Sequence, residues 1–283
     1  MPEPKILLRG LGIPESPRWH DGRLWFCNWI DRQVVALRPD GTPEVMAVRD
    51  PDSHPMGYSI DWLPDGRLLV TGDKLRRQEP DGSMVTHADQ HANEIVVDGR
   101  GNIYLNGADF DFAGGEAPKP GYITLVTPDG ALREVAGDIQ FPNGMVITPD
   151  NRTLVISESF ARRLTAFDIE EDGGLSNRRV FADGLGPDGI CLDAEGAIWV
   201  STGGSSLVRV AEGGEVLQRV ELGKNQAPFA LMLGGPDRRT LFILTAEWRS
   251  EDAITDNIQR LNNGPRTGKI LTLPVSVPGV GRP

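Results

Sequence analysis

Short apolar segments alternate with turn residues along the whole chain. The apolar runs are bounded by Gly, Asp, Asn and Pro, and no stretch shows the periodicity of a long helix. The chain contains 34 Gly and 22 Pro, which are scattered and form no linker-like block. This punctuation predicts many short β-strands joined by tight turns.

A turn followed by an apolar strand recurs six times. The first apolar residue of each copy is, in order, Leu24, Leu68, Ile103, Leu154, Ile198 and Leu241, so the steps are 44, 35, 51, 44 and 43 residues. A second, alternating strand follows each copy, from QVVALRPDG at residues 33–41 to KILTLPV at residues 269–275. Such repeats, about 45 residues long, predict an all-β fold: a six-bladed β-propeller forming a single domain over residues 1–283.

The strand KILLRG, residues 5–10, stands alone ahead of the first repeat. In a closed propeller it is expected to complete the last blade by pairing near KILTLPV. This pairing removes an open sheet edge that would otherwise invite aggregation.

A third repeat, Pro-X-small, lies just before the innermost strand of each predicted blade. The copies are Pro14-Glu15-Ser16, Pro55-Met56-Gly57, Ala92-Asn93-Glu94, Pro142-Asn143-Gly144, Pro187-Asp188-Gly189 and Pro228-Phe229-Ala230, the third lacking the proline. The proline fixes φ, and the small residue lets neighbouring inner strands approach each other. The six middle residues are therefore expected to meet at the axis.

The polar middle residues indicate a cation site. Two carboxylates in a partly buried channel repel each other and lose solvation, at a cost of about several kcal/mol per ion. A divalent cation would remove this cost, with Glu15 and Asp188 supplying two negative charges and Asn143, and also Asn93, offering amide oxygens. Such a set suits Ca²⁺ best, while Mg²⁺ or Mn²⁺ also fit and Zn²⁺ would be a substitute selected by affinity. The alternative is a hydrogen-bonded polar plug around trapped water.

The net charge of the chain limits the classes of molecule that it is expected to bind. A formal net charge of −11 argues against nucleic acid and against anionic membrane surfaces. No apolar run approaches the length of a membrane span, and MPEPKILLRG lacks the apolar region of a signal peptide. A cytoplasmic location is therefore expected.

Four segments resemble the hallmark segments of the SMP-30/gluconolactonase/luciferin-regenerating-enzyme (LRE)-like family, which includes regucalcin. They are GIPESPRW, ANEIVVDGRGNIY, FPNGMVITPD and GPDGICLDAEGAIWV, in the order of that family. The resemblance covers nearly the whole chain. It implies a six-bladed propeller around one divalent cation, with hydrolysis of sugar lactones as the usual activity.

The resemblance also implies roles for particular residues. Glu15, Asn143 and Asp188 match the metal ligands, Asn93 matches a contact to substrate or metal-bound water, and Asp188 also matches the proposed general base. Two positions depart from the family. Glu94 stands where members often carry Asp, and His91 stands where the sugar-lactonase branch typically carries Arg, which leaves the particular sugar open.

The leading hypothesis is metal-assisted hydrolysis of a lactone. The cation polarises the carbonyl, water attacks the carbonyl carbon, and Asp188 takes the proton. A bound cation lowers the pKa of a carboxylate, so water acidified by the cation is an alternative to Asp188 as the base. An organophosphate or aryl-ester hydrolase using the same metal site, and a non-enzymatic ligand-binding propeller, are the alternative functions.

Substrate contacts are expected from His91, Asn93 and Asp109. Asp109 lies on the longest insertion, residues 106–122, which is predicted to be a lid over the mouth. The alternatives are an ordinary loop histidine for His91 and a solvated loop acid for Asp109.

Overall fold

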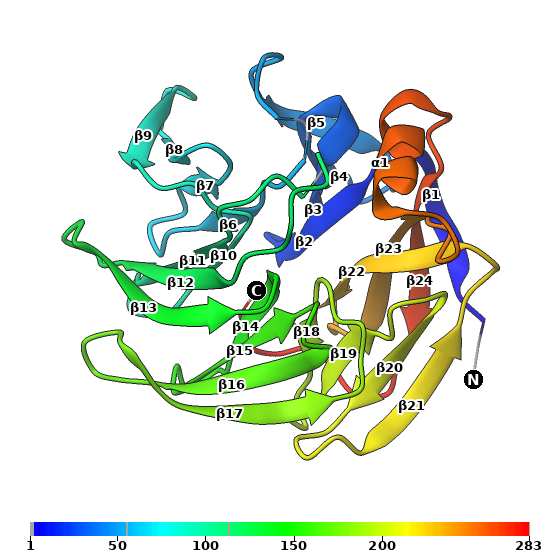
Figure 1. Ribbon diagram of the computed structural model, residues 1–283. Helices are drawn as coiled ribbons and strands as arrows, with labels where there is room; N and C mark the ends of the chain where they lie inside the picture. Colours follow the sequence, from blue (N-terminus) through cyan, green and yellow to red (C-terminus); the bar gives the residue numbers. More distant parts are fainter. Residues whose placement is uncertain (1–2, 55, 113, 283) are drawn as a thin grey trace.

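The computed structural model describes residues 3–54, 56–112 and 114–282. Its strands form six four-stranded antiparallel sheets, arranged around an axis as the blades of a propeller (Figure 1). Blades 1 and 2 are β2 (Pro14–His20), β3 (Arg23–Asn28), β4 (Gln33–Leu37) and β5 (Pro43–Val48), then β6 (Ile60–Trp62), β7 (Leu68–Val70), β8 (Leu75–Gln78) and β9 (Met84–Ala88). Blades 3 and 4 are β10 (Glu94–Val97), β11 (Ile103–Gly107), β12 (Gly121–Val126) and β13 (Leu132–Ile139), then β14 (Pro142–Ile147), β15 (Thr153–Glu158), β16 (Arg163–Ile169) and β17 (Leu175–Asp183). Blade 5 is β18 (Cys191–Leu192), β19 (Ile198–Ser201), β20 (Ser206–Val210) and β21 (Val216–Glu221), and blade 6 is β22 (Gln226–Gly234), β23 (Thr240–Glu247), β24 (Gly268–Pro274) and β1 (Lys5–Leu11).

The sequence repeats correspond to equivalent strands. Each copy of the first repeat forms the second strand of a blade, and each copy of the alternating repeat forms the third. The strand at the start of the chain closes the ring as predicted, because β1 pairs antiparallel with β24, with Lys5 opposite Thr272. Blade 2, which carries the most degenerate repeat, has the short strands β6 and β7 of three residues each.

The hydrophobic core lies between the blades. Among the described residues, six clusters of buried apolar side chains each join two neighbouring blades. Between blades 1 and 2, for example, Cys27 and Val34 pack with Ile60 and Val70. Between blades 1 and 6, Leu24 and Phe26 pack with Met232 and Leu244. Because apolar burial is satisfied between the sheets, the axis is left for other groups.

The small residues of the axial motif allow neighbouring inner strands to approach closely. A Cβ atom placed on Gly144 would lie 2.8 Å from backbone atoms of Asp188, Gly189 and Ile190. A Cβ on Gly189 would lie 2.6 Å from the Cβ of Ala230. The predicted crowding at the axis is therefore confirmed for blades 4, 5 and 6.

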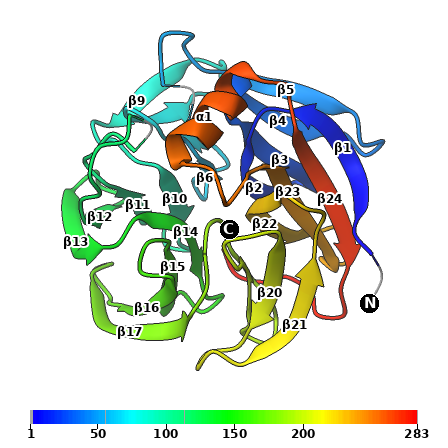
Figure 2. The ribbon, with the colours of Figure 1, turned by 45° about the vertical axis from the view of Figure 1, so that its right-hand side comes forward.

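Two features do not follow the strand pattern. A 3₁₀ turn, η1 (Trp29–Asp31), follows β3. A helix, α1 (Ile254–Asn263), is inserted along the chain between β23 and β24 (Figure 2). The sequence gave no long helical periodicity, but Ile254, Ile258 and Leu261 are spaced for one face of this short helix. Within the described ranges, no helix is long and apolar enough to cross a membrane.

Candidate active site

All six middle residues of the axial motif line one cavity of about 510 Å³ at one end of the axis. Glu15 lies on β2 and Asn143 on β14. Asn93 immediately precedes β10, and Asp188 lies three residues before β18, the inner strand of blade 5. Met56 and Phe229 occupy the equivalent positions of blades 2 and 6. Pro55, the first residue of the second motif copy, lies outside the described residues. The ring order read from the sequence therefore places four polar side chains around one space.

The two axial carboxylates lie in an unfavourable electrostatic environment. Glu15 is 2% exposed, and burial, together with the charges of Asp188 and Glu94, raises its pKa well above the usual range. Burial and the charge of Glu94 raise the pKa of Asp188 to about 7, although a hydrogen bond from the side chain of Asn143 opposes the shift. Both shifts have the same physical cause: negative charge is concentrated where water is largely excluded.

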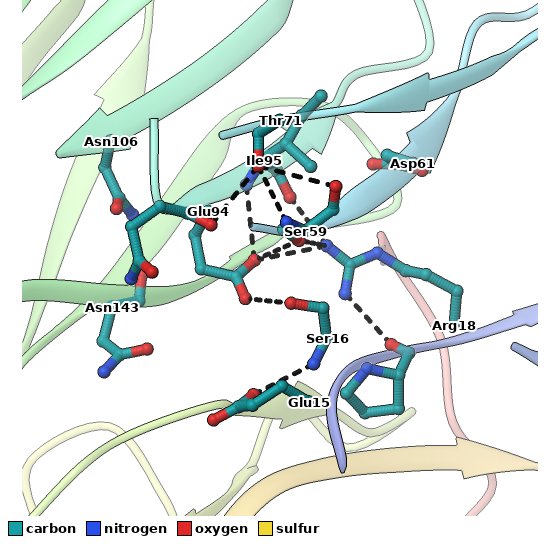
Figure 3. Close-up of polar contacts among 12 residues, drawn as sticks. Glu15, Ser16, Arg18, Ser59, Asp61, Thr71, Glu94, Ile95, Asn106 and Asn143 are labelled. Atoms are coloured by element: carbon teal, nitrogen blue, oxygen red, sulfur yellow. Dashed lines mark hydrogen bonds and ion pairs between the residues drawn. The ribbon is translucent and has the colours of Figure 1, made fainter. Parts of the chain in front are cut away.

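A third buried acid, Glu94, belongs to a hydrogen-bonded network next to Glu15 (Figure 3). The hydroxyl of Ser16 donates to Glu94 Oε1 at 2.6 Å, and that of Ser59 donates to Glu94 Oε2 at 2.8 Å. The guanidinium of Arg18 lies 3.4 Å from the same carboxylate and donates to the carbonyl of Ile95 at 2.7 Å. Arg18 is thus directed toward Glu94.

The network also fixes the conformation next to Glu15. Ser16 has a left-handed φ of 49°, and its backbone N–H donates to Glu15 Oε2 at 2.9 Å. Because a non-glycine residue rarely adopts this conformation, the surrounding contacts must hold it. The bond from the Ser16 hydroxyl to Glu94 is one such contact, so Glu94 acts on the orientation of Glu15 through Ser16.

The donor set fits a hard divalent cation. Within the part of the chain that is described, no three His, Cys, Asp or Glu side chains group as a metal site, so amide oxygens would have to complete the set. Glu15, Asp188 and Asn143 each offer side-chain oxygen atoms, and neither carboxylate forms an ion pair with any of the described residues. Oxygen donors with excess negative charge are the ligands that Ca²⁺ and related ions select.

Two of the three predicted substrate contacts line the cavity, and the third does not. Asn93 and His91 both line the cavity, and His91 is exposed at its edge. Asp109 is not among the lining residues. Its carboxylate accepts a hydrogen bond from the hydroxyl of Tyr122 at 3.1 Å, whereas Asp111, two residues further on, does line the cavity. A substrate role for Asp109 stays a prediction.

The predicted lid reaches across the mouth. The connection between β11 and β12 brings Phe110, Asp111 and Phe112 to the cavity wall. A Cβ on Gly115 would lie 3.5 Å from the methyl group of Thr255, in α1. The connection from blade 3 therefore approaches the helix inserted in blade 6, on the other side of the ring (Figure 2).

Sequence reasoning missed two sets of residues. Glu94 was read only as a departure from the family, yet it is the one non-small residue at the third position of the axial motif, and this irregularity was a usable signal. The aromatic residues of the mouth come from different blades, most of them from connections and Phe229 from strand β22. They have no shared sequence pattern that would have brought them together.

Comparisons with known proteins agree with this architecture. Residues 13–247 match the family model described as SMP-30/Gluconolactonase/LRE-like region. Pentonolactonase XacC of Haloferax volcanii is 27% identical over 94% of this chain and 92% of its own length. A luciferin-regenerating enzyme superposes with a TM-score of 0.80 at 17% identity, covering 99% of this chain and 98% of its own. A calcium-binding protein, regucalcin from Agrobacterium tumefaciens, gives a TM-score of 0.78 at 22% identity, covering 99% and 96%.

Proposed function

Because the chain belongs to the SMP-30/gluconolactonase/LRE-like family, we propose that it hydrolyses a lactone in the axial cavity. The observation that carries the proposal is the convergence of Glu15, Asn93, Asn143 and Asp188 on the floor of one cavity. The relative from Haloferax volcanii, which matches nearly end to end, is named a pentonolactonase. A binding scaffold without catalysis would not need unbalanced carboxylates at this position.

The same proposal includes one divalent cation, Ca²⁺, held by Glu15, Asn143 and Asp188. It is supported by the all-oxygen donor set, by the excess negative charge of the floor, and by the calcium-binding description of the Agrobacterium regucalcin. When bound, a divalent cation supplies a Lewis acid for the carbonyl oxygen of an ester. The Asn143 amide, which hydrogen-bonds Asp188, would keep the two ligands together.

The reaction adds one water to the lactone. A bond forms between the water oxygen and the carbonyl carbon, the ring C–O bond breaks, and the ring oxygen takes a proton, so that a hydroxy acid is released. We assign proton removal from the water to Asp188, whose carboxylate faces the cavity. Asn93 and His91 line the same wall and would orient the substrate.

Metal removal tests the proposal directly. Treatment with a chelator is expected to lower kcat/KM for lactones by at least about tenfold, with recovery on addition of Ca²⁺ or Mn²⁺. Calorimetric titration of the stripped protein with Ca²⁺ should show one site. If chelation changes neither activity nor Ca²⁺ binding, the cation is not part of the site.

Substitution of the candidate base gives a second test. Asp188→Asn is expected to lower lactone kcat/KM by about 10²–10⁴-fold. Asp183→Asn, which changes an exposed acid on β17, is the matched control and should leave the rate unchanged. Full activity of Asp188→Asn would overturn the assignment of the base. The lactonase assignment would be overturned if the Ca²⁺-loaded protein hydrolysed no lactone but turned over an aryl ester or a fluorophosphate.

A further inference from the structure

Aromatic side chains line two sides of the mouth above the polar floor. Phe110, Phe112 and Phe141 form one wall, with ring centroids 4.8 to 6.5 Å apart, and Phe160 stacks on Phe141 at 4.4 Å. Phe229 and Trp248 of blade 6 form the other wall, with their rings at 5.9 Å in an edge-to-face arrangement. The walls thus come from blades on opposite sides of the ring.

The first wall does not serve the core. None of its four phenylalanines belongs to the interblade clusters, and Phe160 is 41% exposed. The other three phenylalanines are half-buried, and aromatic groups that stay accessible and pack on one another are typical of a binding surface. Their position around a cavity indicates a ligand that fits between them.

Backbone strain supports this interpretation. Phe141 has a φ of 59°, a left-handed conformation that is an outlier for a bulky residue. The strained residue immediately precedes Pro142 and Asn143, so it points an aromatic ring into the cavity directly beside a candidate metal ligand. Strain of this kind persists where the surrounding structure requires it, commonly at functional sites.

The polar groups of the walls are mostly engaged with the protein itself. The hydroxyls of Ser159 and Ser201 donate to the carbonyls of Pro187 and Gly186 at 2.7 and 2.5 Å. Arg49 stacks over Tyr58 and donates to the carbonyl of His54 at 3.0 Å. Asn93 remains available near the axis, and His91, Asp73 and Asp111, which also line the cavity, are exposed. The ring hydroxyls of a sugar would therefore meet few partners between the aromatic walls, and burying a polar group without a partner is unfavourable.

We propose that the substrate is a lactone with an apolar substituent, aliphatic or aromatic, rather than a polyhydroxylated sugar lactone. The ester group lies against Glu15, Asn143 and Asp188, and the substituent lies between the two aromatic walls. A volume of about 510 Å³ accommodates a ring with such a side chain. This inference rests on the proposed lactonase activity and specifies its substrate.

A series of lactones tests the substrate class. In the Ca²⁺-loaded protein, kcat/KM is expected to rise by at least about tenfold from γ-butyrolactone to γ-nonalactone, which carries a pentyl group, and to exceed the value for D-glucono-δ-lactone. A higher value for the gluconolactone than for γ-nonalactone would overturn the inference while leaving the lactonase proposal standing.

Variants then test the aromatic wall. Phe141→Gly removes the ring and suits the left-handed backbone, and it is expected to lower the γ-nonalactone to γ-butyrolactone ratio of kcat/KM by at least about tenfold. Asn177→Gly, at another left-handed position near the start of β17 and outside the cavity lining, is the matched control and should keep the ratio. Thermal unfolding checks that both variants fold.

Phe229→Ala, which removes part of the opposite wall, should lower the same ratio of kcat/KM. An unchanged ratio in both aromatic variants would overturn the inference.

Binding without turnover separates the two proposals. 3-Pentylcyclopentanone has the shape of γ-nonalactone but lacks the ester, and calorimetry should show that it binds the wild-type protein more tightly than it binds Phe141→Gly. If it binds in this way and no lactone is hydrolysed, the substrate-class inference holds for ligand binding and the lactonase proposal fails. If it does not bind while gluconolactone is hydrolysed, the inference fails and the activity stands.

Discussion

Two buried glutamates in this protein have opposite electrostatic surroundings. Glu158, at the end of β15, is fully buried, yet it accepts hydrogen bonds from the N–H of Gln140, the hydroxyl of Thr165 and the guanidinium of Arg178. Burial alone would raise its pKa, but these donors, with Arg163, hold it below the usual range. Glu15 at the axis accepts from one backbone N–H, and its pKa is raised.

The difference separates a buried acid that is neutralised by its own blade from a buried acid that is not. Glu158 is neutralised by two arginines within its own blade. At the axis, Arg18 is paired with Glu94 and only partly offsets the shift at Glu15, so the charged forms of Glu15 and Asp188 remain unfavourable. Unbalanced buried charge destabilises a fold unless a ligand compensates it. The electrostatic environment of the axial acids therefore supports the proposal that they bind a cation.

The most direct test of this difference is to replace each glutamate, Glu15 and Glu158, by Gln. Glu15→Gln is expected to weaken Ca²⁺ binding by at least about 100-fold, because the ligand set loses one of its two charges. In the presence of chelator, the same variant should unfold with a free energy about 1 kcal/mol higher than the wild type, since repulsion with Asp188 is relieved. Calorimetry and urea unfolding measure the two effects. A less stable cation-free Glu15→Gln would contradict the comparison.

Glu158→Gln should act in the opposite direction. We expect it to lower the free energy of unfolding by about 1–3 kcal/mol at pH 7, because the arginines lose their charged partner. Since the folded-state pKa of Glu158 lies below its ordinary value of 4.5, this stabilisation is present above that value and is lost as the pH falls through the folded-state pKa. Urea unfolding at pH 7, 5 and 3 should show the two proteins converging, whereas exposed Glu171→Gln should match the wild type throughout.

The smallest expected effect concerns how Glu15 is positioned. Ser16→Ala removes the bond to Glu94, and we expect a loss of about 1 kcal/mol in stability and a Ca²⁺ affinity lower by about tenfold or less. Ser83→Ala, in an exposed turn, is the control and should change neither quantity. If stability falls while Ca²⁺ affinity is unaltered, the network is structural only.

Much of the fold was predictable because the repeats report backbone geometry directly. Turns followed by apolar strands recur in every blade, and the pairing of β1 with β24 follows from the need to close the last sheet. The axial positions were predictable for the same reason: equivalent positions in a ring converge, so Glu15, Asn143 and Asp188 could be grouped without coordinates.

The features that could not be predicted depend on contacts between residues that do not belong to any sequence repeat. Arg18 reaches Glu94 from another blade, and the direction of its side chain cannot be read from spacing. The aromatic wall combines Phe110 and Phe112 of the lid with Phe141 of the next blade, and the helix α1 is too short for its periodicity to stand out among strands. These features arise from tertiary packing, which overrides local pattern.

The way the ring closes has a consequence for biosynthesis. Lys5 pairs with Thr272, so β1 is synthesised more than 250 residues before its partner strand β24, and the sheet of blade 6 cannot be completed until β24 is made. Until then, β1 and the flank of blade 1 remain uncovered, and closure requires two distant parts of the polypeptide to meet, which slows folding. Truncation ahead of β24 would therefore be expected to leave an open, association-prone ring instead of a slightly smaller propeller.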